Sequence, residues 1–396
     1  MTEVAPMEPL PAIKPLDVGA DTNSSPRNLI LCLDGTNNEF SEDNTNVVKL
    51  YSMIDQTRPD QLAYYQPGIG TSVPPGVWGH LKRKVFETID LATAWFLSTH
   101  VIDAYRYLQR FYRDGDRIYI FGFSRGAYTA RAVAAMLHKV GLLTQGNEEL
   151  LPFAYSLFEK RTADNQKLAD EFKTTFSRTV EIHFLGIWDT VSSVGWVWNP
   201  KILPHTSNNP SVRRVRHALA LDERRAFYRP NVWGNVEPTE VTDVLELWFA
   251  GVHSDIGGGY PEEEAGLSAI TLQWMVEEAS AAGLHFNKER RATVLVDEGS
   301  RYALPDPKAK LHTSLKGWWW LLELYPKHYK GNVRTWGPHL GRRRTVEEVV
   351  STVDPETKRK PQLHWSVRER VEAGIGYKPP NLPKDYEQLL WEKGGV

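Results

Sequence analysis

Residues 117–130 read RIYIFGFSRGAYTA, and this stretch decides the fold. The β-branched and aromatic run at its start predicts a short strand, and the alanine-rich segment that continues to His138 predicts a helix. Between them stands GFSRG at residues 122–126, a G-x-S-x-G motif in the strand–turn–helix context that a nucleophile elbow requires. A Cβ at either glycine would crowd the tight turn, which holds the serine at the positive end of the helix. The stretch therefore predicts a nucleophile, Ser124.

Apolar runs on both sides of the motif predict further strands that are buried on both faces. They cover residues 29–33, 182–188 and 245–252, and helical spacing recurs over 47–54, 85–112 and 267–282. Strands that alternate with helices in this way indicate an α/β fold, with a mostly parallel sheet and helices on both faces. The fold class that we expect is therefore α/β.

Composition and charge place the chain among ordinary globular proteins. Hydrophobic residues make up 41% of the 396 residues, charged residues 24%, and the net charge of −2 gives no drive toward nucleic acid. The basic clusters at 342–344 and 358–360 are interpreted as solvated loop surface. The single cysteine, Cys32, lies in an apolar run and is interpreted as core packing, and it allows no disulfide within the chain.

Three segments are expected along the chain. Residues 1–26 read as a disordered leader, 27–287 as the catalytic domain, and 288–396 as a C-terminal extension that wraps or caps the core. The first segment lacks the basic and apolar regions of a secretory signal, and no run of eighteen apolar residues occurs. A cytoplasmic address is the resulting expectation, with signal-independent export left open.

Two polar residues that follow predicted strands can complete the chemistry of Ser124. A serine hydroxyl needs a base, usually a histidine that a carboxylate orients. Asp189 follows the strand at 182–188, and His253 follows the strand at 245–252. The carboxyl ends of parallel strands share one edge of a sheet, so these side chains are expected to meet there. The sequence predicts a triad of Ser124 as nucleophile, His253 as base and Asp189 as acid.

Other residues compete for these roles. Asp255 stands too close to His253 in sequence and is expected to brace the glycine turn at 257–259. Asp222 lies in a segment, VRHALALDERRAF, that is expected to be helical. The rival histidines are expected in helices or near a strand start, as packing or surface residues; they are His138, His183 and His217.

The developing oxyanion also needs hydrogen-bond donors. One should be the backbone N–H of Arg125, directly after the nucleophile. The second should come from the loop after an earlier strand, where Gly35 or Thr36 is the candidate. Asp34, which precedes them, is expected to hold this loop through hydrogen bonds.

Several motifs in order resemble one family of α/β hydrolases. They are LCLDGTNN from residue 31, Asn44–Val47, GFSRGAYTAR, IWDTVSSVG and GVHSDIGGGYPE, and the resemblance covers about residues 27–287. The family was long catalogued as a domain of unknown function, and its best understood members are phospholipase effectors of the type VI secretion system. The resemblance implies the roles given above for Ser124, Asp189 and His253, and an activity on carboxylic esters.

The implied substrate is a small-molecule or lipid ester, with phospholipid as one candidate and neither metal nor organic cofactor required. The segment KGWWWLLELY at residues 316–325 fits a lid or a membrane-docking helix, and equally a buried helix, which we favour. Peripheral membrane contact and the oligomeric state stay open. Two alternatives remain, an idle interaction protein and a metal-dependent phosphoric or sulfuric ester hydrolase that uses Asp34, Asp189, His253 and Asp255 as ligands.

Overall fold

The computed structural model describes residues 26–35, 43–68, 82–191, 203–234, 242–317, 319–324, 327–328, 336–337, 339–346, 349–350 and 358–391. The expected leader at 1–26 lies outside these residues except for its last member. Thr36 and Trp318 also lie outside them.

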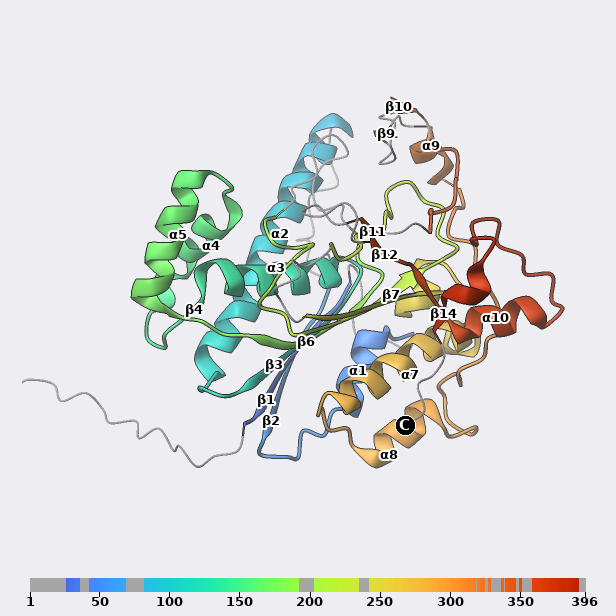
Figure 1. The fold of residues 1–396 in the computed structure, drawn as a ribbon, viewed down its shortest axis with the longest axis horizontal. Coiled ribbons are helices and arrows are strands. Elements are labelled where there is room, and N and C mark those ends of the chain that lie inside the picture. The colour runs from blue at the N-terminus through green and yellow to red at the C-terminus, as the bar shows by residue number, and fades with distance from the viewer. Residues whose placement is uncertain are drawn as a thin grey trace, which may run out of the picture.

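Strands and helices alternate from residue 28 to residue 140 (Figure 1). The later strands at 182–188, 214–220 and 243–249 follow one another, with no helix among the described residues between them. The strands of the central sheet are β1 (Asn28–Leu33), β2 (Gln61–Gln66), β3 (Arg117–Phe123), β6 (Ile182–Trp188), β7 (Arg214–Ala220), β8 (Asp243–Phe249), β13 (Gln362–His364) and β14 (Leu390–Trp391). The α-helices are α1 (Asn46–Met53), α2 (Lys82–Phe111), α3 (Arg125–Val140), α4 (Leu151–Glu159), α5 (Ala163–Phe176), α6 (His253–Gly257), α7 (Gly266–Ala281), α8 (Lys288–Leu295), α9 (Trp319–Glu323) and α10 (Trp365–Glu372).

Short two-stranded ladders and 3-10 turns join these elements. They are the strand pairs β4 (Leu142–Leu143) with β5 (Ser177–Arg178), β9 (Lys327–His328) with β10 (Trp336–Gly337) and β11 (Val349–Val350) with β12 (Lys358–Arg359), and the turns η1 (Glu148–Leu150), η2 (Glu262–Glu264) and η3 (Tyr386–Leu389).

The central sheet has the strand order β14-β13-β8-β7-β6-β3-β1-β2, and each of these pairings is parallel. All the strands therefore end at the same edge. The register aligns Phe123 of β3 with Trp188 of β6, and Trp188 with Ala218 of β7. The residues that follow these ends are consequently close neighbours, as the expected α/β architecture requires, and that fold class is confirmed.

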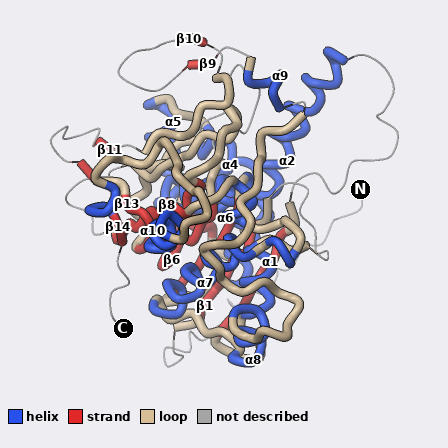
Figure 2. Tube along the Cα trace, turned by 90° about the vertical axis from the view of Figure 1, so that its right-hand side faces the viewer, coloured by secondary structure: helices blue, strands red, loops and turns tan. Residues whose placement is uncertain are grey.

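Alternate residues of the central strands face two separate cores. On β1, Leu29, Leu31 and Leu33 pack with the helices α2 to α5, whereas Ile30 and Cys32 pack with α1, α7 and α8. Figure 2 shows the strands enclosed between these helices. Cys32 is fully buried, so its interpretation as a packing residue is confirmed.

The C-terminal extension does more than cover the core, because it adds strands to the sheet. Residues Gln362 and Leu363 of β13 pair with Leu247 and Trp248 of β8, and β14 pairs with β13 in turn. A third apolar cluster joins the two parts and includes Leu219, Trp248, Leu363 and Val367. The sheet is therefore built from both ends of the chain.

Two segments of the central sheet differ from the sequence-based expectation in kind, and the strand expected at 245–252 ends earlier, at Phe249. The segment around Asp222, expected to be helical, contains the central strand β7. Its alanines and leucines favour helix locally, but burial from 215 to 220 between both cores selects the strand. The edge strand β2 was not predicted, because QLAYYQ lacks a clear apolar alternation.

Candidate active site

Ser124 lies in a strained turn between β3 and α3. Its backbone has φ 58° and ψ −119°, a combination that costs energy for any residue with a side chain. The turn is held by the bond from the Ser124 N–H to the Trp188 carbonyl oxygen at 3.1 Å. The serine hydroxyl is thereby presented at the carboxyl edge of the sheet, where helix α3 begins.

The flanking glycines make this turn possible. A Cβ on Gly126 would lie 2.2 Å from the Leu33 carbonyl oxygen, and a Cβ on Gly122 would lie 2.6 Å from the Gly126 carbonyl oxygen. Both distances are far below van der Waals contact with rigid backbone. The steric interpretation of the G-x-S-x-G motif is therefore confirmed.

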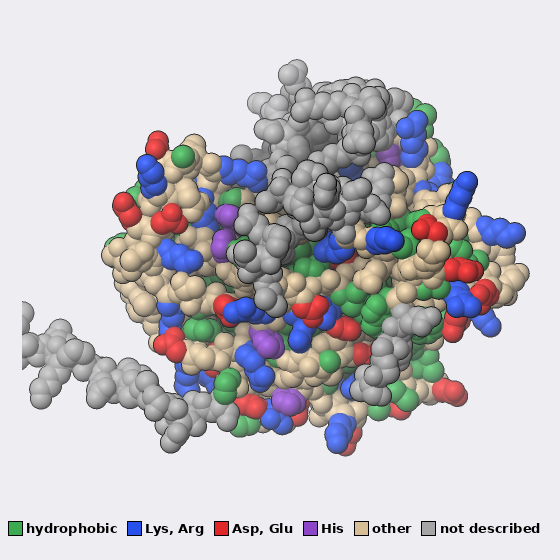
Figure 3. Space-filling model, viewed as in Figure 1, with side chains coloured by type: hydrophobic (Ala, Val, Ile, Leu, Met, Phe, Trp, Pro, Cys, Tyr) green, Lys and Arg blue, Asp and Glu red, His purple; other side chains and the backbone are tan. Residues whose placement is uncertain are grey.

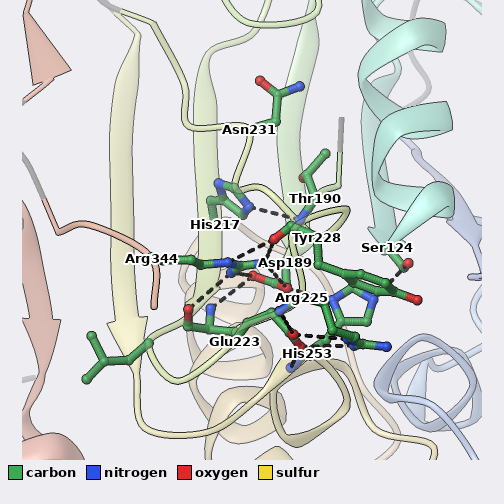
Figure 4. A network of polar contacts seen from close by, with 12 residues as sticks. Ser124, Asp189, Thr190, His217, Glu223, Arg225, Tyr228, Asn231, His253 and Arg344 are labelled. Atoms are coloured by element: carbon green, nitrogen blue, oxygen red, sulfur yellow. Dashed lines mark hydrogen bonds and ion pairs between the residues drawn. The ribbon is translucent and has the colours of Figure 1, made fainter. Parts of the chain in front are cut away.

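Helix α6 carries His253 to the hydroxyl of Ser124. The imidazole Nε2 lies 2.8 Å from Ser124 Oγ, and Nδ1 lies 2.6 Å from Asp189 Oδ2 (Figure 4). The ring packs against Phe123 and Tyr228, with both centroid distances 4.7 Å. The structure thus brings together the three residues of the predicted triad in one hydrogen-bonded chain.

Asp189 is fully buried directly after β6, in a left-handed backbone conformation with φ 37°. Besides His253, its carboxylate accepts hydrogen bonds from the Ala220 N–H at 2.9 Å and from the guanidinium of Arg344. Burial alone would raise the pKa of Asp189, but the charges and hydrogen bonds of Arg344 and His253 outweigh it and hold the pKa below its usual range. Asp189 is an anion at neutral pH.

The imidazole of His253 is held neutral by its surroundings. Burial lowers the pKa of His253 below its ordinary value, although the neighbouring carboxylates of Asp189 and Glu223 oppose that shift. Asp189 beside Nδ1 selects the tautomer with its proton on that nitrogen, which leaves Nε2 as an acceptor. This arrangement can take the proton of a hydroxyl at Ser124.

Glu223, Tyr228 and Arg225 also shape the site, and sequence reasoning missed all three. Glu223 is buried; it accepts from the His253 N–H at 3.1 Å and pairs with Arg225 at 2.9 Å. The Arg225 guanidinium stacks on the Tyr228 ring at 3.5 Å. Burial would raise the pKa of Glu223, but Arg225 lowers it to about 2. The available signal was the charged run DERR at residues 222–225, which comes shortly after the end of β7.

The structure supports one of the predicted oxyanion donors and not the other. Arg125 begins α3, and the first N–H groups of a helix have no intrahelical acceptor, so its N–H is available beside Ser124. The Gly35 N–H, in contrast, donates to Asp34 Oδ1 at 2.6 Å. The Gly35 N–H is therefore engaged within the loop and is not free to stabilise an oxyanion as predicted. The other candidate, Thr36, lies outside the described residues.

Asp34 and the NTNV motif hold the loops around the site. Asp34 Oδ2 accepts from Thr45 Oγ1 at 2.8 Å and from the Tyr65 hydroxyl at 2.9 Å. Asn46 Nδ2 donates to the Ile256 carbonyl oxygen at 3.0 Å and so fixes α6, the helix of His253. These contacts give the motif a physical purpose that the sequence did not reveal.

The rival acids have other partners. Asp255 accepts from the Val252 N–H at 3.0 Å and pairs with His312 at 2.6 Å. These contacts tie α6 to the extension, which differs from the expected brace of the glycine turn at 257–259. Asp222 accepts from the Gly251 N–H and the Tyr377 hydroxyl at 2.9 and 2.7 Å.

The rival histidines also lie away from Ser124. His138 on α3 contacts Ser211, and His183 on β6 contacts the Ala282 carbonyl oxygen. His217 was expected in a helix but sits in the middle of β7, where it pairs with Glu246 at 2.7 Å.

The basic cluster at 342–344 was interpreted as solvated surface, which fits the exposed Arg342 but is wrong for Arg344. Arg343 pairs with Asp222, and Arg344 pairs with Asp189. The side chain of Arg344 is only 5% exposed. Positive charge at these positions compensates acids buried at the ends of strands. On the face in Figure 3, the other basic and acidic side chains are interspersed.

The α/β sheet, the serine elbow and the histidine beside it define the α/β-hydrolase class of proteins. Within that class, the model of the family described as "T6SS, Phospholipase effector Tle1-like, catalytic domain" matches residues 27–278. The chain belongs to this family of phospholipase-type hydrolases.

Individual relatives are more distant. A protein of Saccharomyces cerevisiae described as "Uncharacterized protein YEL023C" is 26% identical, over 94% of this chain and 83% of its own length. An uncharacterized protein from Pseudomonas aeruginosa shares 21% identity over 67% of this chain and 47% of its own, with a TM-score of 0.38.

Two further solved structures are similar. The Tle1 effector bound to the VgrG spike has 18% identity over 61% of this chain and 53% of its own, with a TM-score of 0.34. Acyl-protein thioesterase 2 of Zea mays has 12% identity over 64% of this chain and 95% of its own, with a TM-score of 0.29. The chain thus spans about half the length of the Pseudomonas aeruginosa protein and of the Tle1 effector.

None of the helices in the described residues is long and apolar enough to cross a membrane.

Proposed function

We propose that this chain is a serine hydrolase that cleaves carboxylic esters of lipids through an acyl-enzyme. The single observation that carries the proposal is the continuous hydrogen-bonded chain from Ser124 Oγ through the His253 imidazole to the Asp189 carboxylate, with distances of 2.8 and 2.6 Å. The elbow strain and the family membership support the same conclusion.

The proposed acylation begins when Ser124 Oγ attacks the ester carbonyl carbon while its proton passes to His253 Nε2. The carbonyl electron pair moves onto oxygen, where the Arg125 N–H stabilises it, with a second donor from the loop after β1. As this pair returns, the bond to the alcohol oxygen breaks, and the leaving alkoxide takes the proton from Nε2. The products are a free alcohol and an acyl-Ser124 ester.

Deacylation repeats these steps with water as the nucleophile. His253 takes a proton from water as its oxygen attacks the acyl carbon, and then returns that proton to Ser124 Oγ. A carboxylic acid leaves and the enzyme is restored. Throughout, Asp189 stabilises the imidazolium that forms in each transition state.

The side chain of Arg125 favours an anionic substrate. Arg125 directly follows Ser124 in the sequence and is half-buried, and no ion pair joins its guanidinium to a carboxylate of the described residues. Burial lowers the pKa of Arg125. A cation on the residue that follows the nucleophile fits the phosphate of a phospholipid.

The tryptophan-rich helix α9 fits a lipid substrate as well. Trp319 packs on Tyr228 beside the site at 5.4 Å, while Trp320 and Leu324 are 46% and 60% exposed. The preferred expectation of a buried helix is therefore wrong for these two side chains. Exposed tryptophan and leucine near an active site are suited to contact with a lipid surface.

The metal-dependent alternative is less favoured by the contacts of its proposed ligands. Asp189 binds His253 and Arg344, Asp34 binds Thr45 and Tyr65, and Asp255 binds His312. These carboxylates point to protein donors at three different places, which does not suit a shared ion.

Product analysis with a mixed phospholipid vesicle tests the proposed function. We expect free fatty acid and lysophospholipid, at rates that a chelator such as EDTA leaves within about 2-fold, because the proposed steps need only protein groups. Release of a phosphorylated headgroup, or loss of activity that added divalent metal restores, would support the alternative instead.

The role proposed for Arg125 gives a second test. Arg125→Gln keeps the backbone N–H but removes the charge, so we expect kcat/KM for a short-chain phosphatidic acid to fall about 10- to 100-fold. Hydrolysis of the diacylglycerol with the same acyl chains should change by less than about 3-fold, and Arg125→Lys should retain most of the preference. Equal losses on both substrates would show that Arg125 does not recognise the anion.

A further inference from the structure

The C-terminal extension reaches the active site through a short segment, residues 339–346, which we term the strap. It turns at Leu340 and Gly341, both with left-handed φ angles of 52° and 64°. The fully buried carboxylate of Glu323 holds this turn, since it accepts from His339 Nδ1 at 2.6 Å and from the Gly341 N–H at 3.0 Å. The strap is therefore fixed before it reaches Asp189.

Arg344 of the strap binds the carboxylate of Asp189 in a bidentate manner, through both terminal nitrogens of its guanidinium. Nη1 lies 2.5 Å from Oδ1 and Nη2 lies 3.0 Å from Oδ2. The remaining N–H groups donate to the carbonyl oxygens of Tyr228 and Ala220. Figure 4 shows Arg344 and His253 approaching Asp189 from different directions. A planar guanidinium in this position fixes the plane of the carboxylate and keeps the carboxylate ionised.

This contact has two consequences for His253. The bidentate pair leaves Asp189 one orientation, in which Oδ2 faces His253 Nδ1. The positive charge of Arg344 also offsets much of the negative charge that Asp189 presents to the His253 imidazole. In addition, an arginine that satisfies a fully buried carboxylate removes the large cost of an unpaired ion.

We propose that Arg344 is a positioning residue of the active site, supplied by the extension beyond the family-matched residues 27–278, that orients Asp189 and sets the charge that His253 meets. The inference rests on the proposed function for its effect on catalysis. Its structural basis, the pairing of Arg344 with Asp189, is independent of the substrate.

The neighbouring Arg343 offers a matched control. It belongs to the same strap and pairs with a buried strand-end acid, Asp222, but touches neither Asp189 nor His253. Substitution of Arg343 removes an anchor of the strap without removing the contact to the triad. The two arginines therefore separate loss of the strap's anchoring from loss of the specific contact.

The experiment measures fluorophosphonate labelling rates per folded molecule from pH 4.5 to 9. For Arg344→Gln we expect a plateau rate about 10- to 100-fold lower, in line with the loss of second-layer partners of catalytic groups. Because Asp189 is then uncompensated, the pKa of His253 rises, and the acid limb of the profile moves up by about one pH unit. Arg344→Lys should lose about 5-fold in rate but keep the acid limb in place.

Control variants Arg343→Gln and Arg343→Lys should stay within about 2-fold of the wild-type rate at every pH. If Arg344→Gln lowers thermal stability yet labels at the wild-type rate and pH profile, Arg344 is only structural and the proposal fails. Should Arg344→Gln not fold, the comparison of Arg344→Lys with Arg343→Lys decides, and equal rates for these two would overturn the proposal.

An NMR titration of the His253 imidazole, assigned with His253→Gln, separates this inference from the proposed function. A wild-type protein that does not label would refute the serine hydrolase. Even then, a higher His253 pKa in Arg344→Gln than in wild type would support the charge role of Arg344, and an unchanged value would refute it.

Discussion

Replacing Ser124 by alanine is expected to lower kcat/KM for lipid ester hydrolysis by about 10^4-fold or more, because the proposed acyl-enzyme forms on its hydroxyl. His253→Ala should cost a similar amount, since an unactivated hydroxyl is a poor nucleophile. The double variant should be no slower than either single one, because the two residues act as a unit. Initial rates on a short-chain phospholipid, with the enzyme concentration corrected for folded protein, measure these losses.

Ser280 provides the matched control for this substitution. It lies on α7, where its hydroxyl donates to the Val276 carbonyl oxygen at 2.7 Å. Ser280→Ala should retain activity within about 2-fold. If Ser124→Ala retained more than a hundredth of the wild-type rate, the nucleophile would have to be sought elsewhere.

The second large effect is expected for Asp189→Asn, which should lower kcat about 10^3- to 10^4-fold. An amide at this position can donate to Nδ1 and so favours the wrong tautomer of His253. It also leaves the buried Arg344 without its counter-charge, which should destabilise the fold by about 3–5 kcal/mol. Rates and unfolding free energies measured on the same preparations separate the two effects.

Asp222→Asn is the matched control, since Asp222 is also a buried acid at a strand end with an arginine partner, Arg343. It should lose stability while the rate per folded molecule stays within about 3-fold. Comparable loss of rate in both variants would show that Asp189 acts through the fold alone.

The parts of the site that could be predicted are those that local sequence specifies. The glycines around Ser124 reveal the elbow because a side chain at either position would collide with backbone close by. The colliding atoms belong to the turn itself and to the end of β1. Asp189 could be placed because it directly follows β6, and His253 because it comes shortly after the end of β8, and parallel strands end at a common edge.

Arg344 could not be predicted in this way. It contacts Asp189 across 155 positions of sequence, and an arginine beside two others is typical of solvated loops. Its burial depends on the turn at Gly341 and on Glu323, neither of which carries a local signal. The same holds for β13, whose three residues join the sheet only because β8 offers an edge.

The segment at 215–220 shows the opposite limitation. Its alanines and leucines favour a helix, but the parallel sheet needs a strand between β6 and β8, and burial on both faces outweighs the local preference. His217 and Asp222 were consequently assigned to the wrong element. Glu223, which supports the His253 backbone, was missed for the same reason.

The central claim, that Ser124 is activated by His253 and Asp189, is tested most directly by fluorophosphonate labelling with intact-mass and peptide readout. We predict one adduct on the wild-type chain, located on the peptide that contains Ser124, absent from Ser124→Ala and strongly slowed in His253→Ala. An adduct on another residue, or no adduct on folded wild-type protein, would contradict the account.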